Sequence, residues 1–247
     1  MTTPRFPGGT GVSDLRVYDS RGPDGLHGGS PHLHTASSEG YIVLGGTGEV
    51  HTVTPEGVAA DDLAAGDVLW FSPGTVHRLV NGGGLRIAVV MQNAGLPEAG
   101  DAVFTFPRAV MADDDAYARA AHLPAEAPEE LRAERARVRR DLAVRGYAEL
   151  ADAVRARGPG PLHEFHRRAA ELVRPRVARW REIWREGVEQ EVELTRNQLA
   201  ALAGGEPGVM ARAAVVRTEP HPGPRRFGMC GRLRTRRPAA PGQGAAD

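Results

Sequence analysis

Up to about residue 107, the chain consists of short apolar runs separated by turn residues such as "RGPDG", "GGTGE", "SPG" and "NGGG". This rhythm is typical of an all-β sandwich or barrel. The expected strands are Leu15–Tyr18, His32–Thr35, Gly40–Leu44, Glu49–Thr54, Val68–Phe71, His77–Val80 and Leu85–Gln92. Within them we expect Trp70 and Phe71 to lie in the core.

Beyond residue 107 the apolar positions follow a helical period. Apolar side chains among arginines and glutamates recur at Leu131, Val138, Leu142, Leu150 and Val154, and again from about residue 161 to 203. Pro175 and Gly187 are expected to kink or divide the second block. Because Trp180, Ile183 and Trp184 fall on neighbouring turns, we expect this apolar stripe to pack on the barrel or on a second chain.

These patterns divide the chain into four parts. We expect an N-terminal tail over residues 1–11, a β-barrel over 12–107, a helical extension over 113–205 and an irregular, partly disordered tail over 206–247. The last part holds seven arginines and one acid between Arg217 and Arg237. No recognition helix or aromatic platform accompanies them, so a solvated basic tail without nucleic-acid binding is expected.

The overall charge limits the classes of partner. Lys+Arg and Asp+Glu both number 31, so no global field draws the chain to nucleic acid or membrane. The most apolar stretch, Leu85–Met91, is too short to span a bilayer. Cys230 is the one cysteine, which excludes an internal disulfide, and the first residues lack the apolar run of a signal peptide. A reducing cytoplasm is therefore expected, with Cys230 as a buried, inert thiol.

Four metal-capable side chains stand at suggestive spacing. In "PHLHTASSEGYIVLGG", His32 and His34 share one face of a strand, about 7 Å apart. Glu39 follows early in the next strand, and His77 follows the tight "SPGT" turn. Three imidazoles and one carboxylate converging on one ion leave two adjacent octahedral positions open. The donor set suits Fe(II), which we favour, and also Mn, Ni, Co or Zn.

The chain resembles the cupin superfamily in these residues. The first cupin motif is matched by Gly28 and Gly29 followed by His32, His34, Glu39 and Gly46. The second is matched by Gly66, Pro73, Gly74, His77 and Asn81, with Ser72 where the motif has its proline. The resemblance covers residues 28–81. It implies an all-β cupin barrel, a jelly-roll-like double-stranded β-helix, with a bound metal and any of several activities.

Among these activities we favour a dioxygenase-like oxidoreductase that acts on a small oxygen-bearing, chelating or anionic substrate. An isomerase, epimerase or cyclase that uses the same site as a Lewis acid is the alternative. A non-catalytic sugar- or acid-binding module is a further alternative. A homodimer is expected.

Further roles are expected for individual residues. Glu39 and Tyr41 are the candidate catalytic groups, and Tyr41 and Gln92 the candidate substrate contacts. Tyr41 is interpreted equally well as a core aromatic residue. Apolar walls around an enclosed mouth are expected from Tyr41, Val43, Leu79, Ile87 and Val89. His163 and His166, in "LHEFH", lack a partner carboxylate at zinc-protease spacing and are expected to face solvent.

Overall fold

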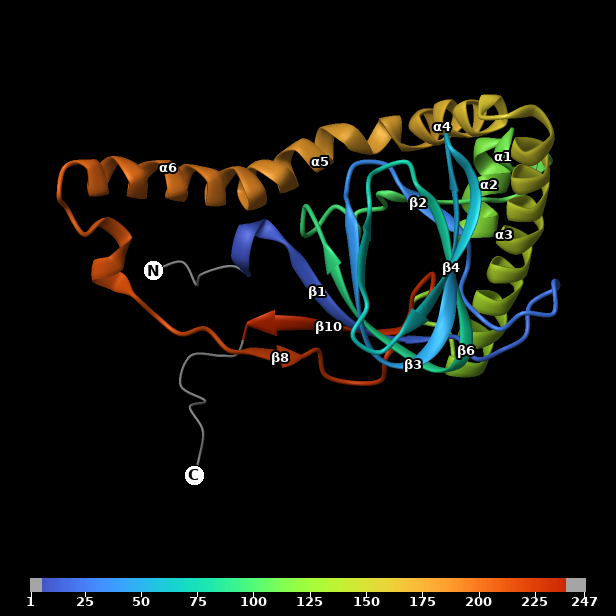
Figure 1. Cartoon of the computed structure of the whole chain (residues 1–247), viewed down its shortest axis with the longest axis horizontal. Coiled ribbons are helices and arrows are strands. Elements are labelled where there is room, and N and C mark those ends of the chain that lie inside the picture. The colour runs from blue at the N-terminus through green and yellow to red at the C-terminus, as the bar shows by residue number, and fades with distance from the viewer. Residues whose placement is uncertain (1–5, 239–247) are drawn as a thin grey trace.

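The computed structural model describes residues 6–238, and its first half is an antiparallel sheet bent into a barrel (Figure 1). The central strand order is β4-β3-β6-β1-β10-β8, with β2, β5, β7 and β9 paired beside it. The barrel strands are β1 Gly11–Val17, β2 His32–His34, β3 Glu39–Thr54, β4 Gly57–Ala64, β5 Val68–Phe71, β6 Val76–Met91 and β7 Ala102–Phe104. This confirms the predicted fold class, a β-barrel followed by helices.

Two long strands replace four shorter predicted ones. The expected breaks at "GGTGE" and "NGGG" lie inside β3 and β6, which pair with each other along most of their length. The register shifts between Val43 and Gly48, so the glycines form bulges that bend both strands together. A Cβ on Gly46 would lie 2.4 Å from the Gly84 carbonyl carbon, which explains why glycine is needed at this bend.

Two strands were missed because their own sequences carry little signal. β4 reads "GVAADDLA" and mostly faces solvent, yet it pairs with β3 through a hairpin at Thr54 and Gly57. β7 is three residues long and pairs with β2. Both depend on a partner strand rather than on local propensity.

The helices cover one side and the top of the barrel (Figure 1). They are α1 Arg108–Met111, α2 Asp114–Ala121, α3 Glu129–Arg157, α4 Gly160–Val173, α5 Val177–Trp184 and α6 Gln190–Ala203. Helix α3 runs along the side, while α4, α5 and α6 follow one another across the top. No loop interrupts the helices at the two expected break points. Pro175 lies in the 3-10 turn η2 Arg174–Arg176, and Gly187 lies in the π-helical turn η3 Arg185–Glu189.

The apolar stripe of the helices packs on the barrel only in part. Trp180 is buried, and its Nε1 donates to the Ala99 carbonyl oxygen at 3.0 Å. Trp184 remains 40% exposed. Helix α6 extends beyond the barrel, and all its residues are exposed or half-buried. Within this single chain the stripe is partly packed on α5, while no residue of α6 is buried. Packing of α6 on a second chain stays a prediction.

The expectation of an irregular segment after residue 206 was wrong for its described part. The 3-10 turn η4 Gly208–Arg212 is followed by β8 Thr218–Pro220, β9 Arg226–Phe227 and β10 Gly231–Pro238. β10 pairs with β1 because its residues alternate, so that Leu233 packs against the barrel core between outward-facing Arg232 and Arg234. Residues 239–247 of the predicted tail lie outside the described residues.

The N-terminal segment also packs against the body where it is described. The turn η1 Pro7–Gly9 lies against η3, and a Cβ on Gly9 would be 3.0 Å from Val188 Cγ2. Residues 1–5 of the expected tail lie outside the described residues. Among residues 6–238, no helix combines the length and apolarity needed to cross a membrane.

Candidate metal centre

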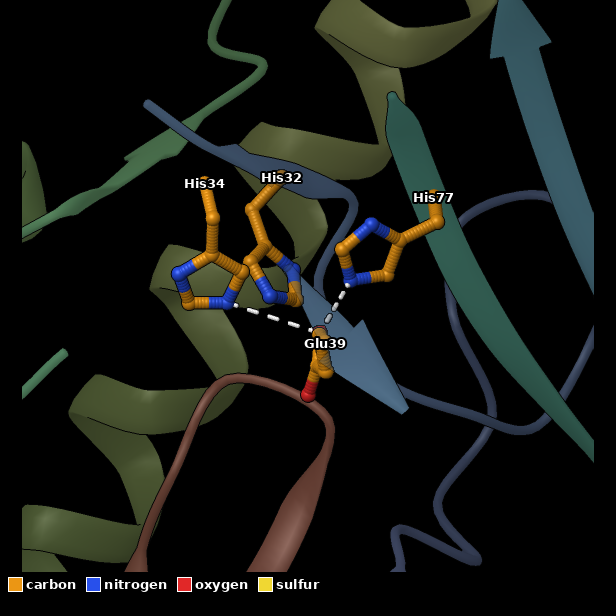
Figure 2. Close-up of side chains that lie close together, drawn as sticks. All are labelled: His32, His34, Glu39 and His77. Carbon is orange, nitrogen blue, oxygen red and sulfur yellow. Dashed lines mark ion pairs between the residues drawn. The ribbon is translucent and has the colours of Figure 1, made fainter. Parts of the chain in front are cut away.

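The four predicted ligand side chains lie close together and point toward one another (Figure 2). His32 and His34 extend from β2, Glu39 begins β3, and His77 lies on β6 directly opposite His32. One ligand atom from each lies within 4.8 Å of all the others, and all four residues are buried. The cluster can hold a metal ion, as the spacing predicted.

The outer nitrogen of each imidazole faces an acceptor away from the cluster. His32 Nδ1 lies 2.9 Å from the Ser30 carbonyl oxygen, and His77 Nδ1 lies 3.1 Å from the Thr75 carbonyl oxygen. A carbonyl oxygen only accepts, so each Nδ1 carries the proton. In the neutral ring, Nε2 then presents a lone pair to the cluster, which is the tautomer a metal ligand needs.

The inner atoms consequently face one another without hydrogen-bond geometry. His77 Nε2 lies 2.8 Å from Glu39 Oε2, and His34 Nε2 lies 3.4 Å from the same oxygen. Neither Glu39 Oε2 nor His77 Nε2 has a hydrogen-bond partner, although both atoms are buried. Lone-pair atoms gathered this closely are stabilised by a shared cation, so the residues present fit a divalent ion.

A fifth group, Asp101, supports the cluster and was missed by the sequence analysis. This fully buried carboxylate lies in the loop before β7, with Oδ2 at 3.4 Å from His34 Nδ1. It also accepts from the backbone N–H groups of Thr35, Ala36 and Ser37 at 2.7–3.1 Å. Asp101 therefore fixes the loop that leads to Glu39 and places a negative charge beside His34, whose Nδ1 makes no hydrogen bond. Nothing in its spacing from the motif indicated this role.

Burial and neighbouring charges set the protonation of the cluster without an ion. Burial, together with the charges of His77 and His34, holds the pKa of His32 well below its usual value. Burial opposes ionisation of Glu39, but contacts with His34 and His77 outweigh it and hold its pKa well below the usual range. For His34, burial is outweighed by Asp101 and Glu39, which raise its pKa to about 9.

The turn before His77 is held from two sides. The backbone N–H of Gly74, at φ 90°, donates to the His34 carbonyl oxygen at 2.8 Å. The Gly74 carbonyl oxygen accepts from Nε2 of His166 on α4 at 2.8 Å. The prediction that His166 faces solvent was wrong, because the helix lays this side chain on the turn. His163 is exposed, as predicted.

Tyr41 and Cys230 belong to a buried core cluster next to the metal ligands, and the Tyr41 ring centroid lies 6.2 Å from that of His77. Tyr41 is fully buried, and its hydroxyl lies 3.8 Å from Cys230 Sγ. Burial, with the neighbouring Cys230 and Glu39, raises the pKa of Tyr41 well above its usual value, so the phenol stays protonated. Cys230 is buried, and burial raises its thiol pKa, in keeping with the predicted inert role.

Two other predicted residues lie away from the cluster. Gln92 is exposed, and its side chain accepts from the Ser38 backbone N–H at 3.2 Å, so it closes the end of a strand pair. Trp70 was expected in the core but is 75% exposed, because it alternates with buried Phe71 and points outward from β5. Phe71 stacks on the His77 ring with centroids 4.6 Å apart.

Comparison with known protein families identifies one part of the chain. Residues 23–91 match the profile of the cupin domain. The chain contains a cupin domain. No match was found among curated proteins.

Several solved structures resemble this cupin domain. One is an uncharacterized protein with a double-stranded β-helix domain from Klebsiella pneumoniae, which is 22% identical in sequence. The aligned region covers 33% of this chain and 64% of the Klebsiella chain, with a TM-score of 0.26. A predicted oxalate decarboxylase from Thermotoga maritima is 22% identical, with the same coverages and a TM-score of 0.27. A sugar 3,4-ketoisomerase from Thermoanaerobacterium thermosaccharolyticum is 16% identical, covering 37% and 64%, with a TM-score of 0.32. The chain thus spans less than two thirds of these proteins.

Proposed function

We propose that this cupin is a metal-dependent enzyme acting on a small oxygen-bearing substrate, with dioxygenation as its reaction. The observation that carries the proposal is the convergence of buried Glu39 Oε2 and His77 Nε2, which lie 2.8 Å apart and make no hydrogen bond, while Nδ1 of His32 and of His77 is committed to a backbone carbonyl. A structural role alone gives no reason to bury such a set. A bound divalent ion would polarise a coordinated oxygen of the substrate.

The exposure of the ligands indicates where the substrate approaches. His34 and Glu39 retain 8% and 6% exposure, whereas His32 and His77 retain 2% and 1%. The expected apolar wall residues Tyr41, Val43, Leu79, Ile87 and Val89 are 0–5% exposed and pack together in one core cluster. They form a filled floor rather than the walls of a mouth. The substrate therefore meets the centre from the side of His34 and Glu39 and is small.

The chain's own residues supply charge and a proton to this site. Glu39 stays ionised and gives the centre its negative ligand. The Tyr41 hydroxyl stays protonated and is electrostatically coupled to Glu39, so it is the candidate proton donor. Lewis-acid isomerisation, epimerisation or cyclisation would use the same donors, as would non-catalytic capture of a sugar or acid. Oxygen consumption separates these reactions from dioxygenation.

The test is turnover measured per bound metal. Protein loaded with Fe(II), Mn(II), Ni(II), Co(II) or Zn(II) is offered small hydroxy acids, keto acids and sugars, with oxygen uptake and product formation followed in parallel. We expect substrate-dependent oxygen uptake with Fe(II). Product without oxygen uptake would assign the Lewis-acid reaction, and binding without turnover under any metal would assign the binding module.

Glu39→Gln sharpens this test. If Glu39 also moves a proton, the variant retains some metal but loses most of its activity per bound ion. Equal activity per ion would show that Glu39 serves only as a ligand. Glu49→Gln is the matched control, because Glu49 lies on the same strand and pairs with His51 outside the cluster.

The expected homodimer belongs to the same proposal. Val68 and Trp70 on β5 are 63% and 75% exposed, and Ile42 and Leu44 on neighbouring β3 are 39% and 47% exposed. Ile42 pairs with Val68, so these side chains form one apolar area on the outer sheet face. A second copy would cover it. Light scattering of wild type should give a dimer and that of Val68→Lys/Trp70→Glu a monomer, while Trp184→Glu on α5 serves as the control.

A further inference from the structure

The arginine-rich C-terminal segment forms a cationic surface when it folds back on the barrel. In the β1–β10 ladder, Arg16 lies directly opposite Arg232. On the other edge of β1, Arg16 lies directly opposite Arg86 of β6. Three arginines from distant parts of the chain thus form one row across the neighbouring strands β10, β1 and β6.

The alternation of the strands directs this row to the outside. Leu15 and Val17 are buried on either side of Arg16, and Leu233 packs against the barrel core between Arg232 and Arg234. Side chains directly opposite on neighbouring strands have Cβ atoms about 4.5–5.5 Å apart, where like charges destabilise the pair. A counter-charge is therefore needed on this face.

The acidic side chains on this face neutralise only some of its arginines. Asp14 pairs with Arg86 at 3.1 Å and with Arg225 at 2.5 Å, and Glu129 pairs with Arg232 at 2.7 Å. Within residues 6–238, neither Arg16 nor Arg234 has a carboxylate partner. Buried Nε atoms of Arg232 and Arg234 also lack a hydrogen-bond acceptor. This face therefore has both hydrogen-bond donors without an acceptor and positive charges without a carboxylate partner.

A hollow of about 460 Å³ lies among these side chains. Its lining includes Arg16, Arg225, Arg232 and Arg234, with Asp19 as the one acid. The four arginines exceed the one aspartate of the lining by a formal charge of +3, and the ion pairs of Arg225 with Asp14 and of Arg232 with Glu129 reduce this excess to +1. None of these lining residues belongs to the metal cluster, so the two sites are separate.

We propose that this hollow binds a phosphate group of a small anionic ligand. The guanidinium fork matches phosphate oxygens, and such bonds are stronger than neutral ones. A small ligand fits better than nucleic acid, because the aromatic ring beside this face, Phe227, is covered by Arg232 and is not free to stack on a base. The guanidinium carbon lies 3.9 Å from the ring centroid.

The test uses inorganic phosphate as the probe and the full chain at low ionic strength, with binding measured by calorimetry. Wild type should bind phosphate, and Arg16→Ala/Arg234→Ala should weaken binding roughly tenfold or more. Arg155→Ala/Arg179→Ala is the control: it removes the same charge from two exposed arginines on α3 and α5. It should leave phosphate affinity unchanged.

Other outcomes would overturn the proposal. An absence of phosphate binding, or equal weakening in both double variants, would reduce the face to a diffuse basic surface. Loss of phosphate binding in His32→Ala/His34→Ala, with its fold verified by circular dichroism, would place the anion at the metal centre. Tight binding of a single-stranded RNA oligonucleotide that phosphate cannot displace would assign the face to nucleic acid. Retained phosphate binding in the metal-site variant keeps the proposal independent of the proposed enzyme activity.

Discussion

The ligands of the candidate metal centre and the groups that support them come from different regions of the molecule. All four ligands lie between His32 and His77, inside the segment that matches the cupin domain. Their supports come from outside the motifs, from Asp101 before β7 and His166 on α4. The ligand set can be recognised from local spacing, whereas the supporting set exists only once the helices are packed and the loop before β7 is in place.

Helix α3 provides a further support at greater distance. The side chain of Arg140 is 2% exposed and donates to the carbonyl oxygens of Ser20, Arg21 and Gly28 at 2.8–3.2 Å. It also pairs with Asp141 at 2.5 Å. These bonds fix the loop that leads into β2, so the helical extension helps to position the first two histidines. If ligands and supporting groups have different roles, removing a ligand should abolish metal binding, whereas removing a supporting group should lower stability or metal affinity.

Removing two ligands should abolish metal retention. His32→Ala/His34→Ala leaves Glu39 and His77, too few donors to hold a divalent ion through purification. We expect elemental analysis to fall from about one ion per chain to background. His122→Ala/His163→Ala removes two exposed histidines and should retain the wild-type content. Unchanged metal in the first variant would disprove the ligand assignment.

Removing Arg140 should destabilise the fold. Arg140→Leu leaves three backbone carbonyls without their donor and Asp141 without its partner, which should cost about 3–5 kcal/mol in the free energy of unfolding. Denaturant titration measures this loss. Arg145→Leu on the exposed side of α3 should change stability by less than about 0.5 kcal/mol. Similar stabilities for the two variants would contradict the supporting role of α3.

Neutralising Asp101 should weaken the metal without removing it. Asp101→Asn keeps the size of the side chain but removes the charge beside His34, and such supporting groups are worth about 10–100-fold in metal affinity. Chelator competition gives the dissociation constant. Asp152→Asn, at an exposed position on α3, is the control. An affinity equal to wild type would limit Asp101 to holding the loop at Thr35–Ser37.

The smallest effect is expected at His166. His166→Ala removes one hydrogen bond to the Gly74 carbonyl oxygen, so the turn before His77 loosens, and stability should fall by about 1 kcal/mol. Metal affinity should fall by less than about tenfold, below the effect of Asp101→Asn. His163→Ala tests the same helix without the bond. If His166→Ala lost as much metal affinity as a variant without a ligand, supporting groups and ligands could not be told apart.

The barrel class and the ligand set could be predicted because each depends on short-range rules. Alternation along a strand puts His32 and His34 on one face, and glycine turns mark where strands bend. Strand boundaries were less predictable, since β3 and β6 continue through their glycines only because each supplies the partner of the other. β4 and β10, with weak apolar signals, likewise form because β3 and β1 offer unpaired edges.

By itself the sequence determined the β-barrel, the helical region and four metal-capable donors at matching intervals. Only the tertiary structure decided which groups hold those donors, because Asp101, Arg140 and His166 approach the site across long loops and helices whose packing no local pattern encodes. It also turned the basic tail into an ordered arginine row, since pairing with β1 depends on a strand more than 200 residues earlier in the chain.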